Sequence, residues 1–197
     1  MWPWGHLAFG YLLYSLSSRA SFGEAPVGGP TLVLAVATQL PDLVDKPLSW
    51  SLRTFETGFG AGHSVFVAVP AVAAVAVLAH HVDRRQYGLA FAVGYGSHLL
   101  ADVALAAVLS KSVVFGRVLW PVVDLAGYET RRGFVERFTS YFLAFGSDVL
   151  SGEASFYVGL YVVLFGAVAA LWSYDGWPVL REAKQWVVDH AEPHRRR

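Results

Sequence analysis

The chain contains no cysteine and a single methionine. Disulfides, thiolate metal ligands and a cysteine nucleophile are therefore excluded. Charge is also scarce, because only 15% of the 197 residues are Asp, Glu, Lys or Arg, against about 25% in a typical soluble domain. The acidic and basic residues balance to a formal net charge of zero, so the composition gives no indication of a nucleic-acid partner.

Three widespread catalytic motifs are also missing. The sequence has no G-x-S-x-G turn, no H-E-x-x-H pair and no phosphate-binding P-loop. It therefore gives no support to a serine hydrolase, a zincin-type protease or a nucleotide-driven enzyme.

Apolar residues are abundant, at 55% of the chain with a mean hydropathy of +0.44. They are concentrated in five segments, which are 4–18, 31–41, 64–79, 87–109 and 155–173. The last three approach or reach the length that crosses a bilayer, and the first two are short enough for buried or re-entrant helices. We predict an all-α, polytopic membrane helical bundle over 1–175 with three full spans, followed by an amphipathic helix and a basic tail over 176–197.

A more polar excursion, 110–154, separates the last two predicted spans. Aromatic residues recur in it at helical spacing, namely Phe134, Phe138, Tyr141, Phe142 and Phe145. A stripe of this kind is typical of a core helix or of a helix that lies at the membrane surface. A lid over a substrate is the alternative.

Basic residues indicate how the bundle is oriented in a cell (inner or plasma) membrane. The chain ends in Arg195, Arg196 and Arg197, and the short loop 80–85 is also basic. Basic loops favour the cytoplasm. We therefore predict a cytoplasmic C-terminus, with loops 46–62 and 110–154 on the outer side.

A few ionisable side chains interrupt the apolar segments or lie at their ends. His98 and Asp102 are four residues apart in segment 87–109, so they lie on one face of a helix. The remaining ones are His6, Asp42, Asp45 and His63. In the predicted orientation this set lies toward the outer side. Imidazoles and carboxylates are ligands that divalent cations such as zinc prefer, and buried ionisable groups in a membrane mark functional sites.

The order of these motifs resembles a known family. His6, the acidic turn "LPDLVDKP", "GHS" before a helix, "GYGSHLLADV" and a later "LWP" are similar to the DUF457, or YdjM-like, family of membrane-bound metal-dependent hydrolases. The similarity covers roughly residues 1–125. That family in turn is distantly similar to the zinc-dependent phospholipase C/P1 nuclease group. The resemblance implies a metal-binding core of that type with one or two zinc ions. It also implies hydrolysis of a phosphoester or lipid-like substrate by metal-activated water.

The resemblance also implies roles for individual residues. Asp42, His63, His98 and Asp102 would hold one metal ion. Asp102 would bridge to a second ion bound by His6. The remaining carboxylate, Asp45, would serve as the general base. Ser64 and Trp120 are candidates for supporting or substrate contacts, although a serine before a helix is also a common N-cap.

Two features depart from the related secreted enzymes. No histidine lies between Asp102 and His190, so a third metal ion is not expected. The stretch "GFGAGHS" lacks the histidine-arginine pair that many family members carry before "HS". A non-catalytic membrane scaffold and a metal or proton transport protein therefore stay open as alternatives. The expected partners are membrane lipid and a small-molecule or lipid substrate.

Overall fold

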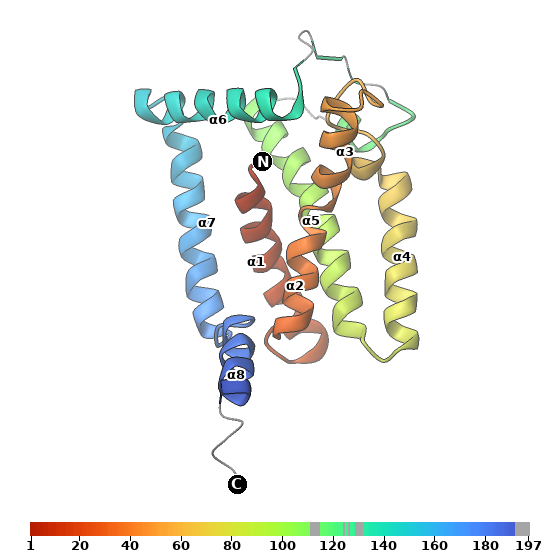
Figure 1. Cartoon of the computed structure of the whole chain (residues 1–197), viewed down its shortest axis with the longest axis vertical. Coiled ribbons are helices and arrows are strands. Elements are labelled where there is room, and N and C mark those ends of the chain that lie inside the picture. The colour runs from red at the N-terminus through yellow and green to blue at the C-terminus, as the bar shows by residue number, and fades with distance from the viewer. Residues whose placement is uncertain (111–114, 124, 126, 129–131, 192–197) are drawn as a thin grey trace.

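The computed structural model describes residues 1–110, 115–123, 125, 127–128 and 132–191, and in this part every regular element is a helix (Figure 1). The α-helices are α1 (Pro3–Phe22), α2 (Gly28–Ala37), α3 (Leu40–Trp50), α4 (Val65–His81), α5 (Arg85–Ser110), α6 (Phe134–Ser151), α7 (Ser155–Tyr174) and α8 (Leu180–Ala191). Two short 3-10 helices, η1 (Ala61–His63) and η2 (Phe115–Val118), lie in the connections. The predicted all-α class is confirmed for these residues.

Helix α5 is the centre of the bundle and packs against α1, α2 and α4. Its approach to α2 requires Gly94, because a Cβ atom at that position would lie 2.9 Å from the carbonyl oxygen of Leu34. The close packing places the C-terminal end of α2 one turn from His98. The contact between these helices therefore sets the position of the polar residues that follow.

Two helices are long and apolar enough to cross a membrane, namely the Arg85–Val108 part of α5 and the whole of α7. Helix α4 is equally apolar but has only 17 residues. The three predicted spans are therefore two full-length candidates and one shorter helix. Many side chains on α7 are exposed, including Phe156, Val162 and Val163, and an apolar surface of this kind marks a contact with lipid or a partner.

Helix α6 lies across the end of the bundle at which α7 begins, and α8 lies at the opposite end (Figure 1). Helix α6 contains the whole predicted aromatic stripe, which is therefore helical. Trp2 packs against it, with ring centroids 6.1 Å from Phe138 and 5.4 Å from Phe145. Gly152, with a φ of +82°, ends α6 in a left-handed cap and allows the sharp turn into α7.

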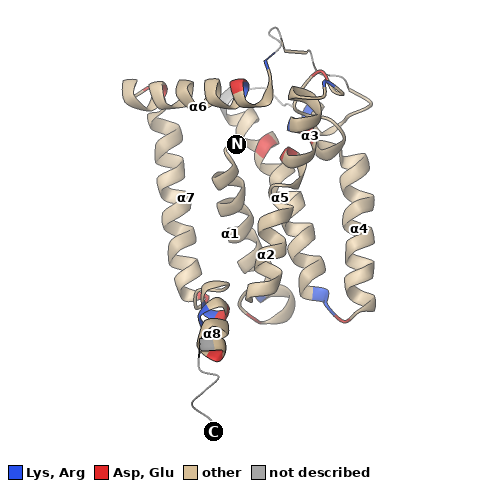
Figure 2. Ribbon diagram, in the orientation of Figure 1, with Lys and Arg blue, Asp and Glu red and all other residues tan. Residues whose placement is uncertain are grey.

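Charged residues gather toward the two ends of the bundle and leave the middle of the helices almost free of charge (Figure 2). At the α8 end, buried Asp175 accepts hydrogen bonds from Tyr11 (2.7 Å), Ser15 (2.7 Å) and Arg19 (2.5 Å). These contacts tie α1 to the end of α7. The other buried histidine and acidic side chains among the described residues lie toward the α6 end.

Candidate metal centre

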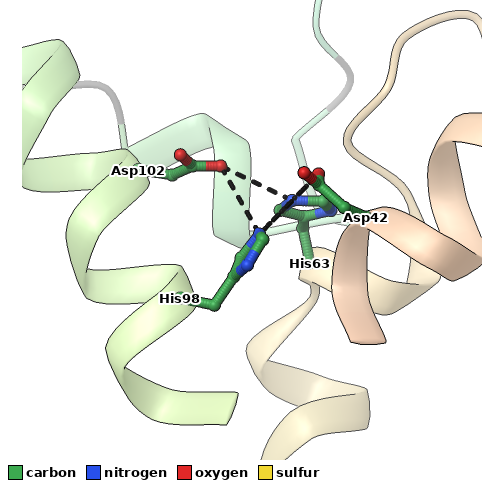
Figure 3. A group of neighbouring side chains, drawn as sticks. All are labelled: Asp42, His63, His98 and Asp102. Carbon is green, nitrogen blue, oxygen red and sulfur yellow. Dashed lines mark hydrogen bonds and ion pairs between the residues drawn. The ribbon is translucent and has the colours of Figure 1, made fainter. Parts of the chain in front are cut away.

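Four of the predicted ligands converge near the α6 end of the bundle. Asp42 comes from α3, His63 from η1, and His98 and Asp102 from α5 (Figure 3). One ligand atom from each lies within 4.8 Å of all the others, and all four residues are buried. The group therefore joins residues that are 60 positions apart in the sequence.

Five of the six spacings between the ligand atoms are close to those around a tetrahedral ion. Nε2 of His63 lies 3.2 Å from Nε2 of His98. Oδ1 of Asp42 lies 3.5 and 3.7 Å from these two nitrogens, and Oδ2 of Asp102 lies 3.6 and 3.7 Å from them. Ligand atoms around tetrahedral zinc are about 3.3–3.6 Å apart, because zinc–nitrogen and zinc–oxygen bonds measure about 2.0–2.2 Å.

The second nitrogen of each imidazole fixes the form of the ring. Nδ1 of His98 lies 2.7 Å from the carbonyl oxygen of Thr38. Nδ1 of His63 lies 2.7 Å from Oδ2 of Asp45. Since both partners only accept hydrogen bonds, both Nδ1 atoms carry a proton. Nε2 of each ring therefore faces the group, and in the neutral ring it offers a lone pair there. Two lone pairs and two carboxylates then face one centre, which is an arrangement that needs a cation.

Asp45 holds the loop that carries His63. Its two oxygens accept hydrogen bonds from the backbone nitrogens of Gly60 (2.7 Å), Gly62 (2.8 Å) and His63 (2.9 Å) as well as from the imidazole. Gly62 is needed here, because a Cβ atom would lie 2.8 Å from the carbonyl oxygen of Pro41. The predicted general base therefore lies behind His63, with both of its oxygens occupied.

The segment expected to be an acidic turn is helical. Helix α3 begins at Leu40, and a proline in the first turn, here Pro41, leaves the helical hydrogen bonds intact. Asp42 and Asp45 are three residues apart and so lie on the same side of α3. One carboxylate reaches the ligand group and the other reaches the far side of the His63 ring.

His6 lies beside the group of four. Its ring stacks on His98 with a centroid distance of 3.7 Å, and its Nε2 lies 3.3 Å from Oδ1 of Asp102. Neither ring nitrogen of this fully buried side chain makes a hydrogen bond with the described residues. Oδ1 of Asp102 also accepts a hydrogen bond from the amino group of Met1 (2.7 Å). The two oxygens of Asp102 therefore face two different sets of neighbours.

Ser64 and Trp120 contact each other rather than the ligand atoms. The hydroxyl of Ser64 donates to the carbonyl oxygen of Trp120 (2.5 Å) and accepts from the backbone nitrogen of Phe66 (3.2 Å). The second contact is an N-cap for α4. The Trp120 ring packs against Phe55.

Neighbouring groups of opposite charge control the charge of the two ligands that lie outside α5, His63 and Asp42. Burial alone would lower the pKa of His63, but Asp102, Asp42 and Asp45 outweigh it and raise the pKa to about 10. Burial would raise the pKa of Asp42, but His63 and Lys46 hold it well below its ordinary value. In the absence of a metal ion, a proton on His63 therefore supplies the cation that the carboxylates require.

A cavity of about 690 Å³ adjoins the group, and Asp42 forms part of its wall. We call this cavity the chamber. Its lining includes two cationic side chains, Lys46 and Arg117, which were not predicted as site residues from the sequence. Lys46 pairs with Asp42 at i,i+4 on α3, a spacing that could have been found once the segment was recognised as a helix. Arg117 comes from η2 and carries no such local signal.

Comparison with known proteins identifies the family but no individual relative. No curated protein and no solved structure matches the chain. The family model described as "YdjM inner membrane protein" matches residues 1–177, which extends well beyond the region on which the sequence resemblance was based. The chain therefore belongs to the YdjM family of inner membrane proteins.

Proposed function

We propose that the protein is a membrane-bound, metal-dependent hydrolase that acts on a phosphoester or lipid-like substrate. The observation that carries this proposal is the convergence of two imidazole lone pairs and two carboxylates on one buried centre. Zinc is the ion that this donor set and spacing favour. A bound divalent cation would supply Lewis acidity, which activates water and polarises a phosphoryl or carbonyl oxygen.

The protein's own residues would hold and orient this centre. Asp42, His63, His98 and Asp102 would bind the first ion. Oδ1 of Asp102 lies 3.3 Å from Nε2 of His6, and the His6 nitrogens make no hydrogen bond with the described residues, so these two side chains would help to hold a second ion. Asp45 is better suited to orienting His63 than to accepting a proton from water, because its oxygens already take four hydrogen bonds.

The relation to the zinc-dependent phospholipase C/P1 nuclease group is part of this proposal. It is supported by the chain order of the five ligand residues, which are His6, Asp42, His63, His98 and Asp102. We also propose that the metal centre faces the outer side of the membrane. This proposal is supported by the position of α6 and α8 at opposite ends of the bundle (Figure 1), since the four ligands gather near the α6 end and the basic tail follows α8.

Metal analysis and hydrolysis assays of the detergent-purified protein test the proposal together. We expect about one or two zinc ions per chain and cleavage of a chromogenic phosphodiester or a phospholipid. His98→Ala should lose most of the metal and the activity. His80→Ala, an exposed histidine on α4 at the other end of the bundle, is the matched control. A protein that binds no divalent metal after metal-replete expression would overturn the proposal.

A further inference from the structure

The chamber next to the metal centre combines a large apolar surface with a small number of charges. Its apolar part comes mainly from α3 and α6, where Leu43, Phe134 and Phe138 line it while remaining open to the exterior. Its volume of about 690 Å³ lies within the range of small-molecule sites, about 300–1,000 Å³. An apolar chain could therefore lie against the aromatic stripe of α6.

The charges of the chamber lie close to the metal centre. Three charged side chains line it, namely Asp42, Lys46 and Arg117. Oδ1 of Asp42 faces the histidines while Oδ2 pairs with the Lys46 ammonium. An ammonium has three donors, so Lys46 can bind Asp42 and still donate to a ligand that approaches from the chamber.

Arg117 approaches the centre through an aromatic ring. Its guanidinium lies over the Phe59 ring at 4.7 Å, and that ring meets the His63 ring edge-on at 4.9 Å. Stacking on an aromatic face leaves the N–H edge of a guanidinium available for bidentate binding of phosphate or carboxylate. Among the described residues no acidic side chain pairs with Arg117. Two cationic side chains, Lys46 and Arg117, therefore line the chamber together with one described carboxylate, Asp42.

We propose that the chamber binds an amphiphile with an anionic, phosphate-type head, with Lys46 and Arg117 holding the head beside Asp42 and the aromatic stripe of α6 holding the chain. This inference rests on the proposed function, to which it adds the substrate class and two specificity-determining residues. The charge complementarity favours an anionic head over a zwitterionic or cationic one. The exposed apolar wall favours a lipid-like molecule over free phosphate.

Photo-labelling of the full-length, metal-replete protein in phosphatidylcholine nanodiscs tests this inference. The probe is a long-chain alkyl phosphonate with a diazirine near the end of the chain, which the protein cannot hydrolyse. The same chain with a trimethylammonium head is the comparison probe. We expect the phosphonate to label peptides of α3 and of the N-terminal half of α6, and the ammonium probe to label them only weakly.

Arg117→Gln is the most direct variant, since Arg117 makes no ion pair with a metal ligand. We expect it to weaken phosphonate labelling about 10-fold, as for the loss of one hydrogen bond to a charged group. Lys46→Gln should weaken phosphonate labelling similarly, whereas Lys46→Arg, which keeps the positive charge, should be labelled as strongly as the unaltered protein. Arg132→Gln removes the same charge from an exposed site near α6 that does not line the chamber, and it should leave labelling unchanged.

The outcomes separate this inference from the proposed function. Equal labelling by the two probes, or normal labelling of Arg117→Gln, would overturn the inference. So would displacement of the probe by inorganic phosphate at equal concentration, because the alkyl chain would then contribute nothing. Selective labelling by a protein that hydrolyses nothing would instead leave the chamber assignment intact and count against the hydrolase.

Discussion

Nε2 of His63 and Nε2 of His98 face each other at 3.2 Å, and each ring has its other nitrogen held by an acceptor. A purely structural pair of histidines would place a donor opposite an acceptor. Here the backbone of Thr38 and the carboxylate of Asp45 impose the same tautomer on both rings. The two rings can therefore lie together only when a proton or a metal ion is shared between them.

Asp45 gives the first prediction. Asp45→Asn should weaken zinc binding by about 10- to 100-fold, the usual cost of losing a partner that orients a metal-bound histidine. The protein should keep its helical content, and competition with a chromogenic chelator measures the affinity. Asp148→Asn, an exposed aspartate on α6, is the control. An unchanged affinity would show that Asp45 does not act through His63.

The second prediction concerns pH. Because the pKa of His63 is raised to about 10 in the metal-free protein, a metal ion must displace a proton throughout the neutral range. The apparent zinc affinity should therefore rise about tenfold per pH unit between about pH 6 and pH 8, with release of one proton. Calorimetry in buffers of different ionisation enthalpy measures that proton, and a pH-independent affinity would contradict the assignment.

The same pKa has the opposite effect on the metal-free fold. A histidine whose folded pKa is above its ordinary value of 6.5 stabilises the folded state most fully below that ordinary value. This contribution is then lost as the pH rises through about 10. Melting of the metal-free protein should accordingly become easier toward alkaline pH, while added zinc should protect it.

The end of the bundle away from the metal centre gives the third prediction. Asp175→Ala removes the shared acceptor of Tyr11, Ser15 and Arg19. It should destabilise the protein by more than about 1.5–3 kcal/mol, the range for a single hydrogen bond to a charged group, because three such bonds are lost. The metal content should stay unchanged. Thermal melting and metal analysis of one preparation check both points. Metal loss in this variant would mean that the two ends are coupled.

The ligand residues could be predicted from the sequence because each lies within an apolar segment or directly at its end. An ionisable side chain in such a place is costly unless it has a partner, so His98 and Asp102 are conspicuous from composition alone. Their approach to Asp42 and His63 follows from helix packing around α5. The order of the motifs, through the resemblance to a family, can suggest this approach, but the spacing of residues within one segment cannot.

The supporting contacts could not be predicted in the same way. The acceptor for His98 is the backbone carbonyl of Thr38, and a backbone group has no signature in the sequence. Its position depends on the close contact between α2 and α5 at Gly94. The prolines of "LPDLVDKP" favour a turn as much as a helix start. The i,i+4 pair of Asp42 and Lys46 could therefore not be predicted, because it forms only if the segment is helical. Arg117 reaches the chamber from a distant connection, so nothing in its neighbourhood links it to the site.

The fourth prediction concerns sidedness. Leu52 lies just after α3, the helix that carries Asp42, and Arg84 lies in the loop between α4 and α5. Both are exposed. The native sequence has no cysteine, so single cysteines can be placed at these positions without background. Leu52→Cys should react with an impermeant thiol reagent on intact cells, and Arg84→Cys should react only after the membrane is opened. The reverse pattern would place the metal centre on the cytoplasmic side.

The last prediction separates a metal centre from a structural polar cluster. If His98 and Asp102 only hold helices together, each single replacement leaves a buried polar partner behind, at a cost of about 3–5 kcal/mol, and a double change to apolar residues recovers much of that loss. If they are metal ligands, the double variant His98→Leu/Asp102→Leu should also fold, because the bundle around α5 is apolar, but it should bind no metal and hydrolyse nothing. Metal content, activity and melting temperature are measured on the same detergent-purified samples, with His80→Leu as the control. A stable double variant that still binds metal would end the assignment of this centre, whereas a stable, metal-free and inactive one would support it.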